Sequence, residues 1–287
     1  MKQNLLDRIN SFLLRQNYTV KNLTRACFDV LARNDSQILL IKVLEDANSI
    51  SKEFADDMKK VAAYIGASPI IISDKAGQSL DDNIVYTRFE IYTLNFNTFL
   101  NCITNKLPLI KSGKAGMTVS ISGRKLKEKR EELGDSLNSL SKKIGVTSRM
   151  ILRYENENSE ITVNKAMKIY DIFGDKVFNK IDIFISQKRP ESSFESSVSK
   201  KYQKLGFDAT DTKKTPFDII ARKESEIILT KVGDKVNPQV ESLSKLLEAD
   251  NLVIFKKKKP KNMPSMTIKE FMEFEEANEL VKFLKEY

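Results

Sequence analysis

The sequence contains no histidine, no tryptophan and only two cysteines in 287 residues. Without histidine the chain cannot build a Ser-His-Asp triad, a Cys-His pair or a histidine-ligated metal site. The two thiols, Cys27 and Cys102, lie far apart in the sequence, which argues against a zinc knuckle and against a disulfide scaffold. No apolar run approaches the ~18 residues that a membrane-spanning helix needs, and the N-terminus lacks a secretory signal. We therefore expect a cytoplasmic protein with no membrane contact and few catalytic options.

Basic residues are in modest excess, with 48 Lys+Arg against 39 Asp+Glu and a formal charge of +9. The excess is spread evenly, because segments 1–116, 117–186 and 187–287 each carry +3. A narrower window, 124–153, places nine basic residues against four acidic ones. Such a cluster is typical both of solvated helix surfaces and of surfaces that bind nucleic-acid phosphates. Charge alone leaves both interpretations open.

Two segments of the chain repeat one another without a gap, at an offset of 189 residues. The first reads FDVLARNDSQILLIKV at 28–43 and the second reads FDIIARKESEIILTKV at 217–232, with nine of sixteen residues identical. Each copy has two β-rich runs around a polar turn, which predicts a hairpin. Helix-period stretches precede both hairpins, and second helices are predicted near 51–64 and 238–248. An apolar strand and a terminal helix follow, so each copy reads as an α/β unit of about 100 residues.

The expected architecture is an α/β multidomain chain in which two related α/β domains flank a central all-α domain. The predicted boundaries are 1–112 for the N-terminal copy, 117–186 for the central domain and 190–287 for the C-terminal copy. The internal duplication is the observation on which this division depends.

The central segment has the pattern of a helix-turn-helix, and residues 136–156 read SLNSLSKKIGVTSRMILRYEN. Gly145 stands where the turn needs a left-handed residue, a conformation that glycine adopts without steric cost. Ser136 and Thr147 are placed to cap the first and second helices. Flanking helices are expected over 123–133 and from Thr162. The core positions of the four helices are predicted to be Leu126, Leu133, Leu140, Ile144, Val146, Ile151, Tyr154, Val163, Ala166, Ile169, Tyr170 and Phe173.

At these residues the sequence resembles the phage-repressor (Cro-type) helix-turn-helix family, over about 122–174. The resemblance implies that the helix beginning at Thr147 enters the major groove of double-stranded DNA. The residues that it implies for DNA contact are Thr147, Ser148, Arg149, Met150, Leu152, Arg153, Lys142 and Lys143.

The implied roles differ with side-chain chemistry. Arg149 can read guanine with two hydrogen bonds, and Arg153 can do the same or hold a phosphate. Met150 or Leu152 can contact a thymine methyl group. The threonine and the two lysines suit phosphates, which add affinity but carry no sequence information.

The same resemblance assigns a structural role to one charged pair. Family members often pair an arginine of the first helix with the glutamate that ends the recognition helix, and Arg130 and Glu155 match those positions. We predict a structural ion pair there rather than a DNA contact.

Taken whole, the chain is similar to a family of archaeal helix-turn-helix transcriptional regulators that place this module between two related α/β domains. The matching residues read FDVLAR and LLIKV in the first domain, ISGRKLKEKREELG at the start of the module and PFDIIAR after it. Because Cro-type modules generally read two half-sites about one helical turn apart, a homodimer is expected.

The Phe-Asp…Lys pattern of both copies also resembles the PD-(D/E)xK nuclease core. That chemistry needs an aspartate on one strand and a carboxylate two residues before a lysine on the next, which together hold Mg²⁺. Asp29 and Asp218 are present with their lysines, but the carboxylate position is Leu40 in one copy and Leu229 in the other. Substitute ligands from neighbouring positions would be Glu226, Asp35 or Glu45. We expect both aspartates to pair with nearby basic side chains instead.

The sequence thus predicts a sequence-specific DNA-binding transcriptional regulator with no enzymatic activity, no catalytic residue, no cofactor and no metal. Two alternatives stay open: a Mg²⁺-dependent nuclease guided by the helix-turn-helix, and a chromatin-type binder without sequence preference. The flanking domains are candidates for dimerisation, additional DNA contact or sensing of an unknown effector ligand.

Overall fold

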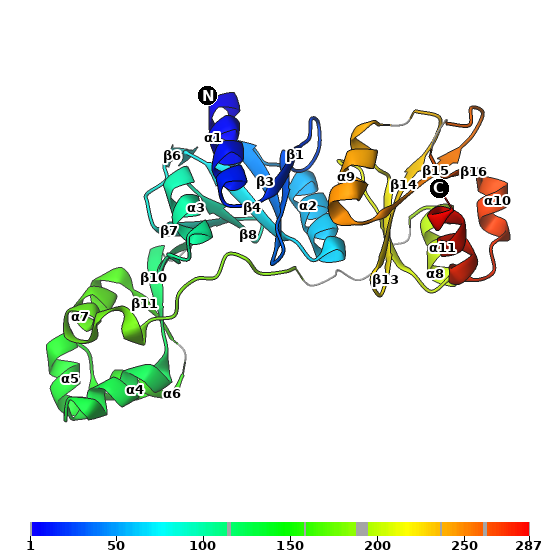
Figure 1. Cartoon of the computed structure of the whole chain (residues 1–287). Helices are drawn as coiled ribbons and strands as arrows, with labels where there is room; N and C mark the ends of the chain where they lie inside the picture. Colours follow the sequence, from blue (N-terminus) through cyan, green and yellow to red (C-terminus); the bar gives the residue numbers. More distant parts are fainter. Residues whose placement is uncertain are drawn as a thin grey trace. The chain divides into compact units, whose positions relative to one another are not determined.

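The structure is a computed structural model that describes residues 2–113, 116–157, 159–187, 195–235, 237–260 and 263–286. The chain forms two compact units (Figure 1). One unit combines Met1–Ile72 with Phe184–Tyr287, and the other is Ser73–Ile183. The first residues of the predicted C-terminal domain, 190–194, lie outside the described residues. In the described ranges no helix is both long and apolar enough to cross a membrane.

The N-terminal copy of the repeat forms one side of the first unit. Its elements are α1 (Lys2–Arg15), β1 (Thr19–Asn22), β2 (Val30–Arg33), β3 (Ile38–Leu44), the short 3-10 helix η1 (Ala47–Ser49), α2 (Lys52–Ile65) and β4 (Ser68–Ser73). The strands follow one another in the order β1-β2-β3-β4, with antiparallel pairing from β1 to β3. Ser51 caps α2, and Gly66 ends it in the left-handed conformation at φ 69°.

The C-terminal copy repeats this order and adds elements at its end. They are α8 (Ser197–Lys204), β12 (Asp208–Asp211), β13 (Ile219–Lys223), β14 (Glu226–Val232), α9 (Gln239–Leu247), β15 (Asp250–Phe255), β16 (Ser265–Thr267), α10 (Ile268–Glu273) and α11 (Ala277–Lys285). The five strands are arranged in sequence order, antiparallel up to β14 and parallel from β14 to β16. Helices α8, α10 and α11 share one hydrophobic core with alternate strand residues, and α9 lies on the opposite face (Figure 1).

The predicted second helices are confirmed as α2 and α9, and both hairpins are confirmed. Each copy also contains a strand that the sequence did not indicate, β1 or β12, which pairs with the first strand of its hairpin. Both cysteines are buried, and burial raises the pKa of Cys102 to about 12.

The two copies contact one another through equivalent residues. Arg33 donates to the backbone oxygen of Leu246 and to the carboxylate of Glu248, each at 2.8 Å. Arg222, which stands 189 residues later, donates to the backbone oxygen of Tyr64 at 2.7 Å. Both carbonyls belong to the last turn of the second helix of the opposite copy, where a guanidinium satisfies orphan acceptors. The copies therefore pack as a reciprocal pair.

The second unit carries the helix-turn-helix and the strands that lead to it. Its elements are β5 (Lys75–Ala76), β6 (Gln78–Ser79), β7 (Ile84–Arg88), β8 (Ile91–Leu94), α3 (Phe96–Ile103), β9 (Ile110–Gly113), β10 (Gly116–Ile121), α4 (Gly123–Glu132), α5 (Leu137–Ile144), α6 (Ser148–Asn156), β11 (Ser159–Thr162), α7 (Val163–Phe173) and the 3-10 helix η2 (Gly174–Val177). Its larger set of strands has the order β8-β7-β9-β10-β11. The central domain is thus not built from helices alone, because β10 pairs antiparallel with β11 inside it.

Four helices enclose the predicted core of this domain, with two exceptions. The buried residues of the cluster include Leu126, Leu140, Ile144, Ile151, Tyr154, Ala166, Ile169 and Phe173, as predicted. Leu133 was expected in the core but is 60% exposed, because α4 ends at Glu132 and the chain turns away. Tyr170 was also expected there but is 53% exposed, because it follows the buried Ile169 around the edge of the apolar face of α7.

Candidate nucleic-acid interface

The turn between α5 and α6 has the local geometry that the sequence predicts. Gly145 adopts φ 78° and its N–H donates to the backbone oxygen of Ser141. Thr147 caps α6, its hydroxyl accepting from the backbone N–H of Met150, and Ser136 caps α5 in the same way. Both caps satisfy backbone donors that a helix start leaves without partners, so the position of α6 is fixed at its first turn.

One face of α6 is open to solvent. Arg149, Leu152 and Arg153 are exposed, and their spacing of three and four residues places them side by side on the helix surface. Ile151 and Tyr154 are buried in the core on the other side. A protruding face that carries two guanidinium groups and an apolar side chain has the chemistry needed to contact base edges in a DNA groove.

The remaining predicted contact residues of this helix lie closer to the core. The hydroxyl of Ser148 is half-buried and stands 3.2 Å from the hydroxyl of Ser141. Met150 is half-buried and packs against the core cluster. Thr147 is exposed, although its hydroxyl serves the helix cap. The first turn of α6 is therefore more tightly held than the solvent face that follows it.

The cations around α6 differ in their partners. Lys143 donates to both carboxylate oxygens of Asp135, at 2.7 and 2.9 Å, and these bonds lower the pKa of Asp135. Arg153 lies 3.6 Å from the carboxylate of Glu157. Lys142 and Arg149 form no ion pair with a described residue. These two positive charges are thus available to a polyanion without breaking an ion pair within the described part of the chain.

Arg130 and Glu155 form a two-point ion pair that joins α4 to the end of α6. The guanidinium Nε lies 2.6 Å from Oε1 and the Nη2 atom lies 2.9 Å from Oε2. A third bond runs from Nη1 to the backbone oxygen of Asp135, at 2.9 Å. The side chains are only 11% and 2% exposed, and the hydrogen bonds that Arg130 donates to Glu155 raise the pKa of Arg130. The pair therefore lies inside the domain.

Gly123 positions α4 against α6, a role that the sequence did not lead us to expect. A Cβ atom at this position would lie 2.5 Å from the backbone oxygen of Glu155 and 2.6 Å from that of Tyr154. The first turn of α4 thus rests directly against the backbone of α6, which no larger residue permits. The available signal was a glycine at the first position of a helix, where it is otherwise unfavourable.

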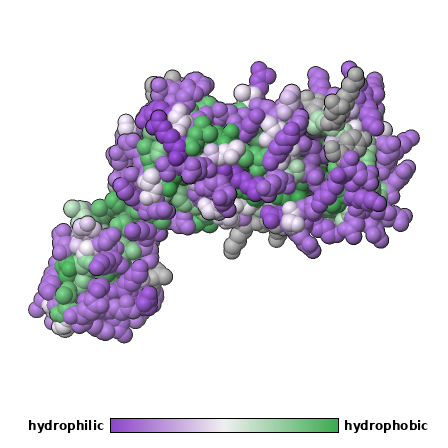
Figure 2. All heavy atoms as spheres, in the orientation of Figure 1, coloured by the Kyte–Doolittle hydropathy of each residue, from purple (hydrophilic) through white to green (hydrophobic). Residues whose placement is uncertain are grey.

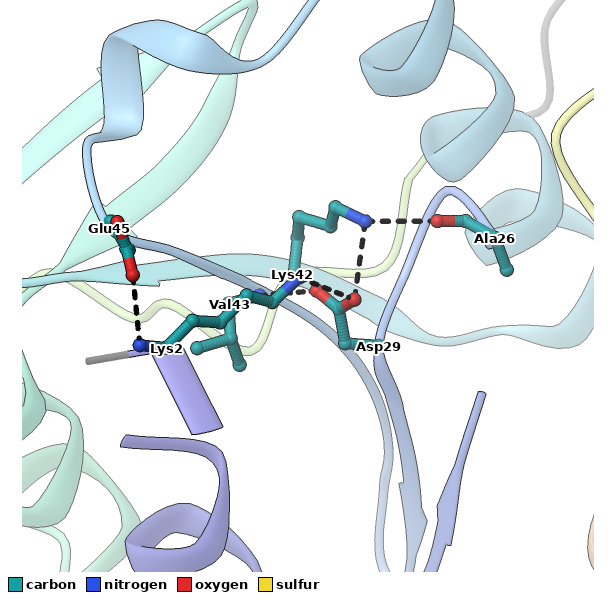
Figure 3. Close-up of polar contacts among 6 residues, drawn as sticks. All are labelled: Lys2, Ala26, Asp29, Lys42, Val43 and Glu45. Atoms are coloured by element: carbon teal, nitrogen blue, oxygen red, sulfur yellow. Dashed lines mark hydrogen bonds and ion pairs between the residues drawn. The ribbon is translucent and has the colours of Figure 1, made fainter. Parts of the chain in front are cut away.

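The aspartates of the nuclease-like pattern form structural contacts in both copies. Figure 3 shows Asp29 between Lys42, at 3.4 Å, and the backbone N–H of Val43, at 2.8 Å, and Lys2 donates to the same carboxylate at 3.0 Å. Asp218 repeats this with Lys231 and the N–H of Val232, at 2.8 and 2.7 Å. The predicted pairing of both aspartates with basic side chains is confirmed. Burial lowers the pKa of Lys42.

The donor set of these sites does not fit a magnesium ion. Leu40 and Leu229, where the second carboxylate belongs, are fully buried in the strands. Both oxygens of Asp29 already accept hydrogen bonds, and the substitute candidate Glu226 pairs with Lys285. Among the residues that the structure describes, no group of three acidic or cysteine side chains is placed to hold a metal. The arrangement is that of an ion pair stabilising a hairpin.

Comparisons with known proteins agree with this architecture. Residues 2–109 match the PD-(D/E)XK superfamily domain and residues 126–174 match the helix-turn-helix domain. A protein of Methanosarcina acetivorans is 30% identical over 99% of this chain and 97% of its own length. Proteins of Methanosarcina barkeri and Methanocaldococcus jannaschii are 31% and 29% identical with the same coverage. All three carry the name "Putative HTH-type transcriptional regulatory protein". No solved structure matches the chain.

Proposed function

Because this chain belongs to the archaeal family of HTH-type transcriptional regulatory proteins, we propose that it is a sequence-specific DNA-binding regulator whose helix α6 reads the major groove. The observation that supports this most is the exposed face of α6, on which Arg149 forms no ion pair with any residue that the structure describes. A guanidinium in this position can donate two hydrogen bonds to the O6 and N7 atoms of guanine. Arg153 and Leu152 complete the reading face, toward a second base or phosphate and toward a thymine methyl group.

The residues around this face have supporting roles in the proposal. Lys142 binds the DNA backbone directly, whereas Lys143 must exchange the carboxylate of Asp135 for a phosphate. Ser148 and Met150 lie at the edge of the contact, since they are half-buried. Thr147 caps the N-terminus of α6 and lies next to the phosphates of the DNA backbone.

Arg130 and Glu155 belong to the support of the reading helix rather than to the interface. Their two-point contact fixes the end of α6 against α4, and both side chains are buried. A DNA contact from Arg130 would leave the Glu155 carboxylate buried without a counter-charge, which is strongly unfavourable.

We expect the protein to act as a homodimer that reads two half-sites about one helical turn apart. The reciprocal contacts between the copies at 1–112 and 190–287 already use the C-terminal ends of α2 and α9 within one chain. Because these helix ends are already occupied within one chain, we expect the two chains of the dimer to contact each other through other surfaces. The domain around 117–186 carries the DNA-binding face in this arrangement.

The PD-(D/E)XK-like domains are proposed to be non-enzymatic. Leucine replaces the second carboxylate in both copies, and the remaining aspartates are held by lysine and backbone donors. Incubation of the protein with plasmid and short duplex DNA in Mg²⁺ or Mn²⁺ tests this. We expect intact DNA, and cleavage that disappears in the Asp29→Ala/Asp218→Ala variant would establish the nuclease instead.

Selection from a random duplex library tests DNA recognition itself. The purified full chain is expected to enrich two related half-sites separated by one helical turn, about 10–10.5 base pairs. Arg149→Ala should lose the enriched motif at one position of each half-site. Arg124→Ala is the matched control, because Arg124 is an exposed arginine of the same domain that pairs with Glu128 on α4. A library that stays unenriched would favour the chromatin-type binder.

A further inference from the structure

A cavity of about 700 Å³ lies beside α7 within the second unit. Its walls come from the segment that follows α3, from β10, from α7 and from the residues after η2. The apolar side chains that line it include Leu107, Leu109, Val119, Met167, Tyr170 and Phe178. Small-molecule sites generally have volumes of about 300–1,000 Å³ and mostly apolar walls, so this cavity has the size and lining of a ligand site.

Two large apolar side chains at its mouth are exposed to water. Met167 is 60% exposed and Tyr170 is 53% exposed, although the buried face of α7 is adjacent. Figure 2 shows hydrophobic surface on the helix-turn-helix part of the chain among mostly hydrophilic atoms. A bound molecule with an apolar body would cover both side chains and gain the free energy of their removal from water.

The polar groups around the cavity favour an anionic ligand. Lys106 and Lys180 line it, and neither forms an ion pair with a described residue. Asp175 is the single acidic lining residue, and it lies beyond ion-pair distance of both lysines. Asn83, Asn101 and Asn105 also line the cavity, and the Asn101 amide donates to Oδ1 of Asn83 at 2.9 Å. The net positive charge at the rim complements a carboxylate or sulfonate.

We propose that this cavity binds a small organic acid with an aromatic or aliphatic body and one anionic group. Met167, Tyr170 and the apolar walls take the body, and Lys106 with Lys180 takes the acid. The walls come both from α7 of the DNA-binding bundle, through Met167 and Tyr170, and from the strands, through Val119 of β10. A ligand that fills the gap would therefore fix the bundle against its strands.

A pair of matched fluorescent probes tests the site directly in the full chain. 8-Anilinonaphthalene-1-sulfonate carries the anionic group, and N-phenyl-1-naphthylamine has the same aromatic body without it. We expect both to bind once per chain with increased fluorescence. Lys106→Gln/Lys180→Gln should weaken the sulfonate at least about fivefold and leave the neutral probe within about twofold. Met167→Gln should weaken both probes.

Leu133→Gln is the control for exposed apolar surface, because Leu133 is also 60% exposed but does not line the cavity. It should leave both affinities unchanged. The proposal is overturned if Leu133→Gln weakens the probes as much as Met167→Gln does, or if the sulfonate has no preference for the lysines. It is also overturned if raising the protein concentration displaces the probes, since a second copy of the chain would then cover the cavity.

The effect of a ligand on DNA affinity rests on the proposed function and has its own measurement. With saturating sulfonate probe, the affinity for a selected DNA site should change by about fivefold or more, a common size for coupling between two sites. DNA binding that is insensitive to a bound probe would refute regulation from this site. Absence of DNA binding would refute the proposed function while the probe titrations still decide the ligand site.

Discussion

Replacing Arg130 by methionine removes the guanidinium that neutralises Glu155 between α4 and α6. The Glu155 side chain is 2% exposed, so its charge would remain inside the domain without a partner. Breaking a buried ion pair in this way costs about 3–5 kcal/mol. The lost hydrogen bond to the backbone oxygen of Asp135 adds about 1 kcal/mol. Since a domain is stable by only ~5–15 kcal/mol, a large part of the stability of the helix-turn-helix should be lost.

The double variant Arg130→Met/Glu155→Leu is expected to behave differently. It removes both charges together and fills their space with apolar atoms, so its stability should return to within about 2 kcal/mol of the wild type. The four chains of this cycle give the coupling energy between the two residues. Hydrogen exchange of the α4 and α6 amides, followed by mass spectrometry, is the suitable measurement because it reports the stability of this domain separately from the others.

A change of less than about 1 kcal/mol in the opening free energy of α4 and α6 on Arg130→Met, the value of a solvent-exposed pair, would show that the pair is not buried in solution. A purely structural role is also refuted if the double variant is folded but has lost affinity for DNA that the wild type binds. Arg130 would in that case contact DNA, and the pair would not be purely structural.

Three further predictions follow from local geometry. Gly123→Ala should destabilise the helix-turn-helix by about 2–3 kcal/mol in thermal unfolding, because the added Cβ would lie 2.5 Å from a backbone oxygen. Gly113→Ala is the control and should be neutral, because a Cβ at that position meets no described atom within 4 Å. Asp29→Asn should lower the stability of its hairpin by ~3 kcal/mol, measured by hydrogen exchange, and Asp218→Asn should lower that of the other hairpin by only ~1 kcal/mol. The costs differ because the Asp29 side chain is 10% exposed and that of Asp218 is 36% exposed, and a buried ion pair costs more to break. Equal costs would contradict this. Both cysteine thiols should resist 5,5′-dithiobis(2-nitrobenzoate) at pH 8 and react fully in guanidinium, since burial raises their pKa values; rapid reaction of the folded chain would show that the cores are open.

The parts of the fold that the sequence predicts are those with short-range causes. Gly145 and Thr147 determine the turn and cap of α6 through their own backbone conformation and hydroxyl group, so their roles are visible in a window of a few residues. The hairpins at 28–43 and 217–232 are visible because two independent copies show the same alternation of apolar runs and polar turn. Local chemistry and repetition are sufficient for these elements.

The parts that the sequence does not predict depend on distant residues. Strands β10 and β11 pair across three intervening helices, so no turn signal links them. The contact of Gly123 with the backbone of α6 arises only when the bundle packs. Leu133 follows the heptad-like spacing of a core residue, but the helix stops one residue earlier and leaves it in solvent. Tertiary packing decides the strand pairing and the Gly123 contact, whereas the exposure of Leu133 depends on where α4 ends.

The ratio between the affinities for a selected DNA site and for a scrambled site of equal length tests the central claim most directly. Measured by fluorescence anisotropy at one fixed salt concentration, this ratio should be at least about 10³ for the wild type. It should fall by roughly 10–100-fold in Arg149→Ala, which removes one bidentate base contact, and stay unchanged in Arg124→Ala. A ratio near one in the wild type, or the same ratio in both variants, would contradict sequence reading by α6.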